Sequence, residues 1–245
     1  MTEIASQPLA WVTGANGLIG HYLVQTAPRF APGWRVRALT RADFDLLDFA
    51  AMDREFRRDR PQLVVHCAAV STPGAALAHP DLARRVNVEA TGRLAALAAE
   101  AAFLFLSSDH VFDGLKGHYV ETDAPNPPTL YAETKLAAEQ IILQNPRHTV
   151  VRTSLNGGIS RAGARAFNEQ IRRAWEAGQT LNLFTDEFRS PIAAVVTARA
   201  LWELAGRGRT LLTASALTSL LSDIKEAHSA IEILLRKQAV SPAKP

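Results

Sequence analysis

Short apolar runs alternate with longer segments of helical periodicity through the first 155 residues of the chain. Runs at residues 9–13, 34–39, 62–66, 103–107 and 149–152 have the length and composition of strands. Residues 19–26, 49–59, 81–101 and the segment that begins at Tyr131 have the periodicity of helices. The run at 103–107 is almost wholly apolar, which is typical of a strand buried on both faces of a parallel sheet.

This alternation predicts an α/β fold with a doubly wound parallel sheet of the Rossmann type. Ligands of such sheets bind beyond the carboxyl ends of the strands. Small and polar residues fall at the predicted strand ends, namely Thr13, Thr40, Ala68, Ser108 and Thr153. We therefore expect a single site along that edge.

The pattern loosens after residue 155. A glycine-rich loop at 156–163 precedes a predicted helix at 164–177, a further strand at 210–214 and an amphipathic helix at 219–237. We expect a nucleotide-binding domain at 1–155 and a small substrate-binding lobe at 156–245 that is interleaved with the sheet.

Composition is that of a soluble globular protein, with 47% hydrophobic and 21% charged residues among 245. The net charge of +3 has its densest basic cluster at 54–60, which we interpret as a solvated helix face and not as a nucleic-acid site. No run approaches the roughly 20 apolar residues that span a bilayer. The single cysteine, Cys67, excludes an internal disulfide and favours a cytoplasmic protein. No pattern of residues indicates a metal site.

The string Thr13-Gly-Ala-Asn-Gly-Leu-Ile-Gly20 directly follows the first strand and opens a helix. Glycines in such a turn allow a tight bend, close approach of backbone to a pyrophosphate and close helix–strand packing. We therefore expect the glycines at 14, 17 and 20, with Asn16, Leu18 and Ile19, to bind a dinucleotide.

The end of the second strand indicates which dinucleotide is bound. An acid about 20 residues past the glycines would bind the ribose of NAD, but the strand ends in Thr40 and Arg41, with no acid before Asp43. A guanidinium suits the 2′-phosphate of NADP, so we favour NADP, with NAD as the alternative. Asp45 and Leu46 can meet the adenine, while Asp48 can instead cap the next helix.

Tyr131 and Lys135 lie four residues apart and would share one face of a helix. A phenol titrates near pH 10, so it becomes a useful acid at neutral pH when a neighbouring cation lowers its pKa. We expect Lys135 to do this beside a bound nicotinamide.

These motifs together resemble the extended short-chain dehydrogenase/reductase family, and within it the dTDP-4-dehydrorhamnose reductase branch. The most specific stretch is Ser107-Ser-Asp-His-Val-Phe-Asp-Gly114, followed by Tyr119-Val-Glu-Thr-Asp123 and Tyr131-Ala-Glu-Thr-Lys-Leu136. Residues 64–69, Val86-Asn87 and Val151-Arg-Thr-Ser154 add to the match, which runs from about residue 9 to about 205.

The resemblance implies a role for each matched residue. Ser108 orients the substrate carbonyl, Tyr131 is the acid-base, and Lys135 holds the nicotinamide ribose. Asn87 supports this catalytic set, although it can also be a polar residue of a helix that satisfies backbone groups. The resemblance further places Cys67, Ala68 and Ala69 along the cofactor, and Ser71 and Asp109 against the sugar. His110 is expected to be a packed loop residue and not a base.

The chain departs from the branch near the substrate. Leu155 stands where an aromatic residue usually follows the Arg-Thr-Ser string. In the later Asp-Gln-x-Gly-x-Pro-Thr string, Glu187, Arg189 and Ile192 replace the Gln, Gly and Thr. We also expect the substrate lobe to be shortened at its C-terminal end.

The function that this resemblance implies is reduction of a keto group on a nucleotide-linked sugar, in a homodimer paired through residues 81–101 and 131–143. Two alternatives remain open. One is an epimerase or dehydratase of the same family, and the other is a non-catalytic, nucleotide-binding regulatory subunit.

Overall fold

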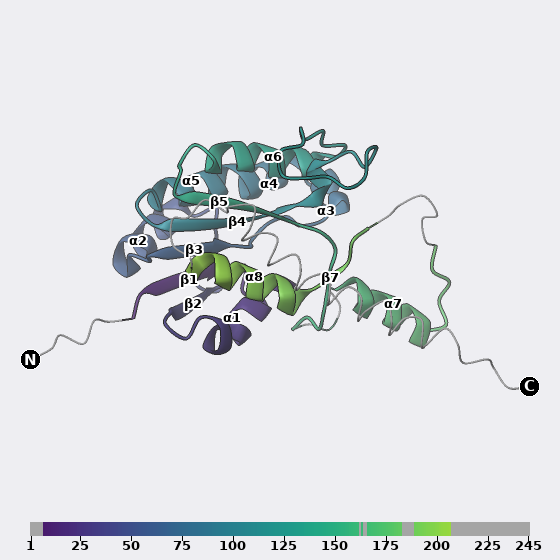
Figure 1. The fold of residues 1–245 in the computed structure, drawn as a ribbon, viewed down its shortest axis with the longest axis horizontal. Helices are drawn as coiled ribbons and strands as arrows, with labels where there is room; N and C mark the ends of the chain where they lie inside the picture. The colour runs from purple at the N-terminus through teal and green to yellow at the C-terminus, as the bar shows by residue number, and fades with distance from the viewer. Residues whose placement is uncertain (1–6, 162, 164–165, 183–188, 207–245) are drawn as a thin grey trace, which may run out of the picture. The chain divides into compact units, whose positions relative to one another are not determined.

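A computed structural model describes residues 7–161, 163, 166–182 and 189–206. Five parallel strands form the central sheet in the order β2-β1-β3-β4-β5 (Figure 1). They are β1 (Leu9–Thr13), β2 (Arg35–Leu39), β3 (Leu63–His66), β4 (Ala102–Ser108) and β5 (His148–Thr153). The predicted α/β doubly wound sheet is therefore confirmed, and each strand lies within about one residue of its predicted position.

The central strands are buried on both faces because both alternating sets of their side chains are apolar. Every residue of β1 is buried, with Trp11 on one face and Val12 on the other. In register, Val12 lies between Ala38 of β2 and Val65 of β3. This register brings the carboxyl ends of β1 and β3 to one edge, where the polar residues of the site follow.

Helices cover both faces of the sheet (Figure 1). Helix α1 (Leu18–Phe30) packs beside α8 (Ala194–Gly206), and the indole of Trp202 donates to the Leu23 carbonyl at 3.0 Å. The opposite face is covered by α2 (Phe49–Asp59), α5 (Thr91–Leu97) and α6 (Leu130–Ile142). Two separate apolar cores therefore hold the strand ends in place.

The predicted helix over 81–101 is wrong in its continuity. The segment contains α4 (Pro80–Arg84), a π-helical turn η1 (Arg85–Ala90) and α5, which ends at Leu97. A further helix that was not predicted, α3 (Pro73–Ala78), precedes them and is capped by Thr72. Pro80 begins α4 because a proline fits the first turn, where its missing N–H costs nothing.

The described residues from 156 to 206 belong to the same compact unit as the sheet. The strand pair β6 (Asn156–Gly157) and β7 (Ile192–Ala193) is parallel, and α7 (Phe167–Glu176) lies between them in sequence. Helix α8 then packs on the sheet, while the division at residue 155 and the interleaved substrate lobe stay predictions. The predicted strand at 210–214 and helix at 219–237 lie outside the described residues.

Within the described ranges, no helix is both long and apolar enough to cross a membrane. Groups of three or more metal-ligating side chains are likewise absent from these ranges.

Candidate active site

The glycine turn joins β1 to α1 and contains two close backbone approaches. Gly14 has a φ of +67°, and a Cβ placed there would lie 2.8 Å from the Ala68 amide nitrogen. A Cβ on Gly20 would lie 2.3 Å from the Gly14 carbonyl oxygen. Both positions therefore require glycine, and the first brings the loop after β3 against the turn.

Helix α1 begins after Gly17, which offers no side chain to cap the first N–H groups. An uncapped helix start is a favourable place for a phosphate because its N–H groups and dipole both attract anions. Asn16 is exposed on the turn, and its Oδ1 accepts from Nη1 of Arg161 at 3.1 Å. No motif indicated Arg161, which reaches the turn from the loop after β6.

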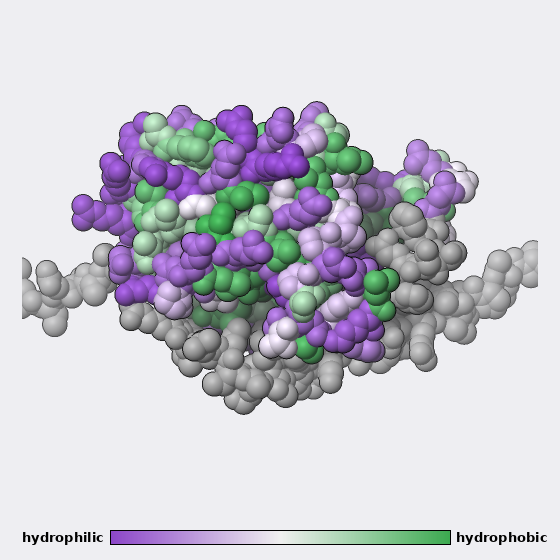
Figure 2. Space-filling view, turned by 90° about the horizontal axis from the view of Figure 1, so that it is seen from above, coloured by the Kyte–Doolittle hydropathy of each residue, from purple (hydrophilic) through white to green (hydrophobic). Residues whose placement is uncertain are grey.

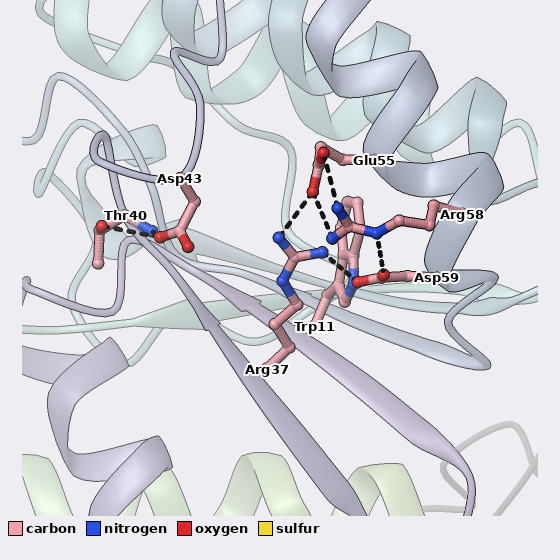
Figure 3. Close-up of polar contacts among 7 residues, drawn as sticks. All are labelled: Trp11, Arg37, Thr40, Asp43, Glu55, Arg58 and Asp59. Atoms are coloured by element: carbon pink, nitrogen blue, oxygen red, sulfur yellow. Dashed lines mark hydrogen bonds and ion pairs between the residues drawn. The ribbon is translucent and has the colours of Figure 1, made fainter.

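Most polar side chains near the end of β2 are already paired (Figure 3). Arg37 bonds to Asp59 and, at 2.7 Å, to Glu55, and its guanidinium lies 5.7 Å from the Trp11 ring centroid. Trp11 itself donates to Asp59 at 2.9 Å. Burial opposes ionisation of Asp59, but the bonds from Arg37, Trp11 and Arg58 hold its pKa below the usual value.

The loop after β2 leaves Arg41 as its available cation. Asp43 is held by Thr40, whose backbone N–H and hydroxyl donate to it at 2.8 and 2.9 Å (Figure 3). Arg41 is exposed and makes no hydrogen bond or ion pair with any residue that the structure describes. Asp45 is also exposed, and Asp48 caps α2 by accepting from Ala51 at 2.9 Å.

The end of β3 is fixed by a buried chain of hydrogen bonds. Nδ1 of His66 lies 2.7 Å from the Thr13 hydroxyl, and its Nε2 lies 3.0 Å from the Thr91 hydroxyl. Burial lowers the pKa of His66 to about 3, so the ring is neutral. The Thr13 hydroxyl also accepts from the amides of Cys67 and Ala68, at 3.2 and 3.3 Å. These bonds hold the β3 loop against the glycine turn.

Cys67 has the properties of a structural residue. Burial raises the pKa of its thiol to about 12. Since only the thiolate is a good nucleophile, this raised pKa disfavours a covalent role for Cys67.

Ser108 and Tyr131 meet at the carboxyl end of β4. Ser108 is the last residue of β4, and its hydroxyl accepts from the His110 amide at 3.2 Å, which begins the short 3₁₀ turn η2 (Asp109–Val111). Tyr131 lies in the first turn of α6, which is capped by Thr129, and only 8% of it is exposed. The His110 ring stands edge-on to the Tyr131 ring at 5.8 Å.

The pKa of Tyr131 is raised, chiefly by burial and further by the charge of Asp109. Hydrogen bonding with Ser108 and the charge of Arg189 act in the opposite direction. The sequence predicted a pKa lowered by Lys135, and the structure differs because Lys135 is directed elsewhere.

Lys135 lies one turn beyond Tyr131 and is 2% exposed. Its Nζ donates to the Leu106 carbonyl at 2.7 Å and lies 3.9 Å from the centroid of the Phe105 ring. Burial lowers its pKa to about 7, while the charge of Glu139 acts to raise it. The amine thus sits beneath the same strand end that presents Ser108.

Asn87 joins two elements of the site. Its Oδ1 accepts from the Val70 amide at 2.8 Å, and its Nδ2 donates to the Val70 carbonyl at 3.1 Å and to the Thr134 hydroxyl at 2.9 Å. Thr134 in turn donates to the Tyr131 carbonyl at 2.7 Å. Asn87 thus satisfies backbone groups and, through Thr134, contacts the helix that carries Tyr131, while its role in the catalytic set stays a prediction.

The comparisons with known proteins decide the family. The profile of the RmlD substrate binding domain matches residues 10–216. The chain belongs to this family. It lies within the extended short-chain dehydrogenase/reductase family, as the sequence motifs predicted.

The chain is similar to two curated relatives and to one solved structure. It is 38% identical over 141 residues to the bovine (Bos taurus) methionine adenosyltransferase 2 subunit beta, a match that covers 55% of this chain and 42% of that protein. It is 33% identical over 217 residues to the dTDP-4-dehydrorhamnose reductase of Mycobacterium tuberculosis, covering 83% of this chain and 69% of that protein. The dTDP-4-dehydrorhamnose reductase of Bacillus anthracis, solved with NADP, has a TM-score of 0.74 and 23% identity, with 82% of this chain and 72% of that chain covered. The match to the first of these thus spans about two fifths of that protein's length.

The structure brings together most of the site residues that the RmlD-type motifs predicted. Ser108, Tyr131 and Lys135 lie at the end of β4, and the glycine turn lies against the loop containing Ala68. Ser71, by contrast, is exposed and makes no hydrogen bond with the described residues.

Arg189 is the contact of the site that the sequence motifs did not reveal. It lies shortly before β7, yet its Nη2 donates to Oδ1 and Oδ2 of Asp109 at 3.1 and 3.0 Å, and its Nη1 lies 3.1 Å from Nε2 of His110. The only signal in the sequence was that an arginine replaces the usual glycine of the family string.

Proposed function

We propose that this chain is an NADPH-dependent reductase of a keto group on a nucleotide-linked sugar. The observation that carries the proposal is the placement of Ser108 and Tyr131 together at the end of β4, with Lys135 one turn further along the same helix. A serine, a tyrosine and a lysine at that edge are the groups that a ketone and a nicotinamide need.

The residues of the turn fit a dinucleotide. The close approach at Gly14 leaves backbone without side chains where a pyrophosphate would lie, and the start of α1 offers uncapped N–H groups. Arg41 suits a 2′-phosphate, and the reductase solved with NADP supports the same cofactor, with NAD as the alternative. When bound, NADPH supplies the hydride, and the chain supplies position and protons.

Residues of the chain protonate the ketone oxygen and stabilise the negative charge that develops on it. Tyr131 gives its phenolic proton to that oxygen as negative charge develops on it. Ser108 donates a hydrogen bond to the same oxygen, which stabilises the developing charge. Lys135 is placed to hold the nicotinamide ribose once its amine leaves the Leu106 carbonyl.

The substrate class is a nucleotide-linked sugar, as the name of the mycobacterial relative supports. A direct test follows the absorbance of NADPH while the protein is mixed with a panel of nucleotide-linked keto sugars, dTDP-4-dehydrorhamnose among them. We expect NADPH oxidation with at least one of them. Tight NADPH binding without oxidation by any member of the panel would contradict the proposal.

A second candidate is a cofactor-binding subunit of a larger enzyme. It is favoured by the similarity to proteins named as a subunit of methionine adenosyltransferase. The sequence identity to the bovine subunit, 38%, is higher than the 33% identity to the mycobacterial reductase. The intact Ser108, Tyr131 and Lys135 favour the reductase instead. NADPH binding without turnover in the panel assay would give the subunit more weight.

We also propose a homodimer paired through α4, η1, α5 and α6. Figure 2 shows apolar side chains gathered in the middle of the face seen from above Figure 1, the side on which these helices lie. Leu82 of α4 is 41% exposed, and Leu143, directly after α6, is 60% exposed. Light scattering should give twice the chain mass, and a monomer would contradict this pairing. A cytoplasmic location, predicted from the single cysteine, stays a prediction.

A further inference from the structure

Asp109 already uses its full capacity to accept hydrogen bonds. Its Oδ1 accepts from Ser108 at 3.3 Å and from Arg189 at 3.1 Å, and its Oδ2 accepts from Ser154 at 2.7 Å and from Arg189 at 3.0 Å. An ionised carboxylate has about four acceptor positions. The predicted contact of Asp109 with a sugar is therefore replaced, in this structure, by contacts with the chain itself.

Arg189 also orders the residue next to Asp109. Its Nη1 lies 3.1 Å from Nε2 of His110. A guanidinium can only donate, so Nε2 acts as the acceptor and the imidazole in this contact is neutral. The same ring stands edge-on to Tyr131 at 5.8 Å. One guanidinium thus contacts both Asp109 and His110, and the His110 ring in turn contacts Tyr131.

The charged groups near Tyr131 can be followed element by element. Asp109 and Arg189 act on its pKa in opposite directions. On α6 itself, Glu133 is exposed, Lys135 bonds to Leu106, and the buried Glu139 is paired with Arg152 of β5 at 2.6 Å. Strand β4 and α3 carry no charged residue, and on α5 Arg93 is paired with Asp53. The remaining charged residues on α4 and η1 are all exposed, namely Asp81, Arg84, Arg85 and Glu89.

We propose that Arg189 is a positioning residue of the Tyr131 site, which holds Asp109 and His110 in place and cancels the carboxylate charge beside the phenol. This role of Arg189 deepens the proposed reductase function and rests on it, but the experiment that tests the role does not require reductase activity. Arg189 takes the place of the family's glycine. Its guanidinium therefore binds Asp109 at the position where a substrate hydroxyl would otherwise be expected.

The experiment titrates the Tyr131 phenol directly, without cofactor or substrate. The chain has three tyrosines, so ¹³C labelling at tyrosine Cζ gives few NMR signals, and Tyr131→Phe identifies the one of interest. We expect Arg189→Leu to raise the titration midpoint of Tyr131 by about one pH unit, as is usual on loss of a nearby opposite charge. Asp109→Asn should lower the midpoint, and the double variant should return close to the wild-type value.

Controls separate charge from folding. Arg189→Lys keeps the charge and should stay near the wild-type midpoint. If Arg189→Leu does not fold, Arg189→Gln takes its place as the variant that lacks the charge, and its midpoint is compared with that of Arg189→Lys. Arg172→Leu removes an exposed arginine whose pairing with Glu176 spans 3.8 Å, and should leave the Tyr131 midpoint unchanged.

An unchanged midpoint in both Arg189→Leu and Arg189→Gln would overturn the inference, and so would an equal rise in Arg172→Leu. A chain that shows the expected shifts but reduces no keto sugar would contradict only the proposed function. A chain that reduces a keto sugar but shows no shift would contradict only the role of Arg189.

Discussion

Gly14 faces Ala68 so closely that a Cβ on Gly14 would lie 2.8 Å from the Ala68 amide nitrogen. The Gly14→Ala variant must therefore bear two costs. The positive φ of +67° costs about 1–2 kcal/mol for a residue with a Cβ, and overpacking adds about 1–3 kcal/mol. We expect denaturant unfolding to show a loss of stability that equals the sum of both.

Gly178 provides the matched control for this variant. Its φ is +62°, but nothing lies within 4 Å of an added Cβ. Gly178→Ala should therefore lose only the conformational part, about 1–2 kcal/mol. Equal losses in the two variants would show that the contact between Gly14 and Ala68 is not restrictive.

Arg41 should discriminate between the two dinucleotides. Because Arg37 is occupied by Asp59 and Glu55, Arg41 is the cation that can reach a 2′-phosphate from the end of β2. Arg41→Ala should weaken NADPH binding at least tenfold and leave NADH binding nearly unchanged, as measured by fluorescence titration. Arg35→Ala, an exposed position at the other end of the same strand, serves as the control. Equal losses for both cofactors would contradict the preference for NADP.

Arg161 should behave differently from Arg41. It contacts Asn16 on the glycine turn at 3.1 Å, close to the part that both dinucleotides share. We expect Arg161→Ala to weaken NADPH and NADH by a similar factor of several-fold in the same titration. A selective loss of NADPH would instead place Arg161 near the 2′-phosphate.

Lys135 should lower the stability of the protein at neutral pH. Its pKa is about 7 in the fold and about 10.4 in an unfolded chain. Between these values the unfolded state binds more protons, so stability rises with pH. Lys135→Met removes the cost of burying the amine and should melt at a higher temperature than wild type at pH 7. The difference in melting temperature should become smaller as the pH approaches 10.

Lys116→Met provides the comparison for the lysine variant. Lys116 is an exposed lysine paired with Asp123 at 2.5 Å, so its removal should not raise the melting temperature at pH 7. A lower melting temperature for Lys135→Met throughout the pH range would mean that the contacts with Leu106 and Phe105 outweigh the cost of burying the amine.

The sheet was predictable because its strands carry local signals. The runs that became β1, β3 and β4 are short and apolar, and the structure places each within about one residue of the prediction. The breaks between α3, α4, η1 and α5 were not predictable in the same way. The Ala- and Leu-rich periodicity continues through them, and the π turn that presents Asn87 to Val70 depends on contacts outside the helix.

The site was predictable where chemistry lies in contiguous motifs. Gly14, Ser108, Tyr131 and Lys135 belong to such strings, and the fold gathers them at the strand ends. Arg161 comes from a loop without a motif, and Arg189 stands where the family string has a glycine. They reach Asn16 and Asp109 across 145 and 80 residues of sequence. The direction of Lys135 was also missed, because a helix spacing does not reveal that the Leu106 carbonyl competes for its amine.

Transfer of deuterium from NADPH labelled at the hydride position is the most direct measurement of the proposed reaction. Mass spectrometry should find the label on the reduced carbon of a nucleotide-linked keto sugar with the wild-type protein. Tyr131→Phe should bind NADPH with nearly unchanged affinity but transfer no label, because the proton donor is lost. Wild-type protein that binds NADPH but labels no sugar would contradict the proposed reduction. Full transfer by Tyr131→Phe would contradict the proposal that Tyr131 donates the proton that accompanies hydride transfer.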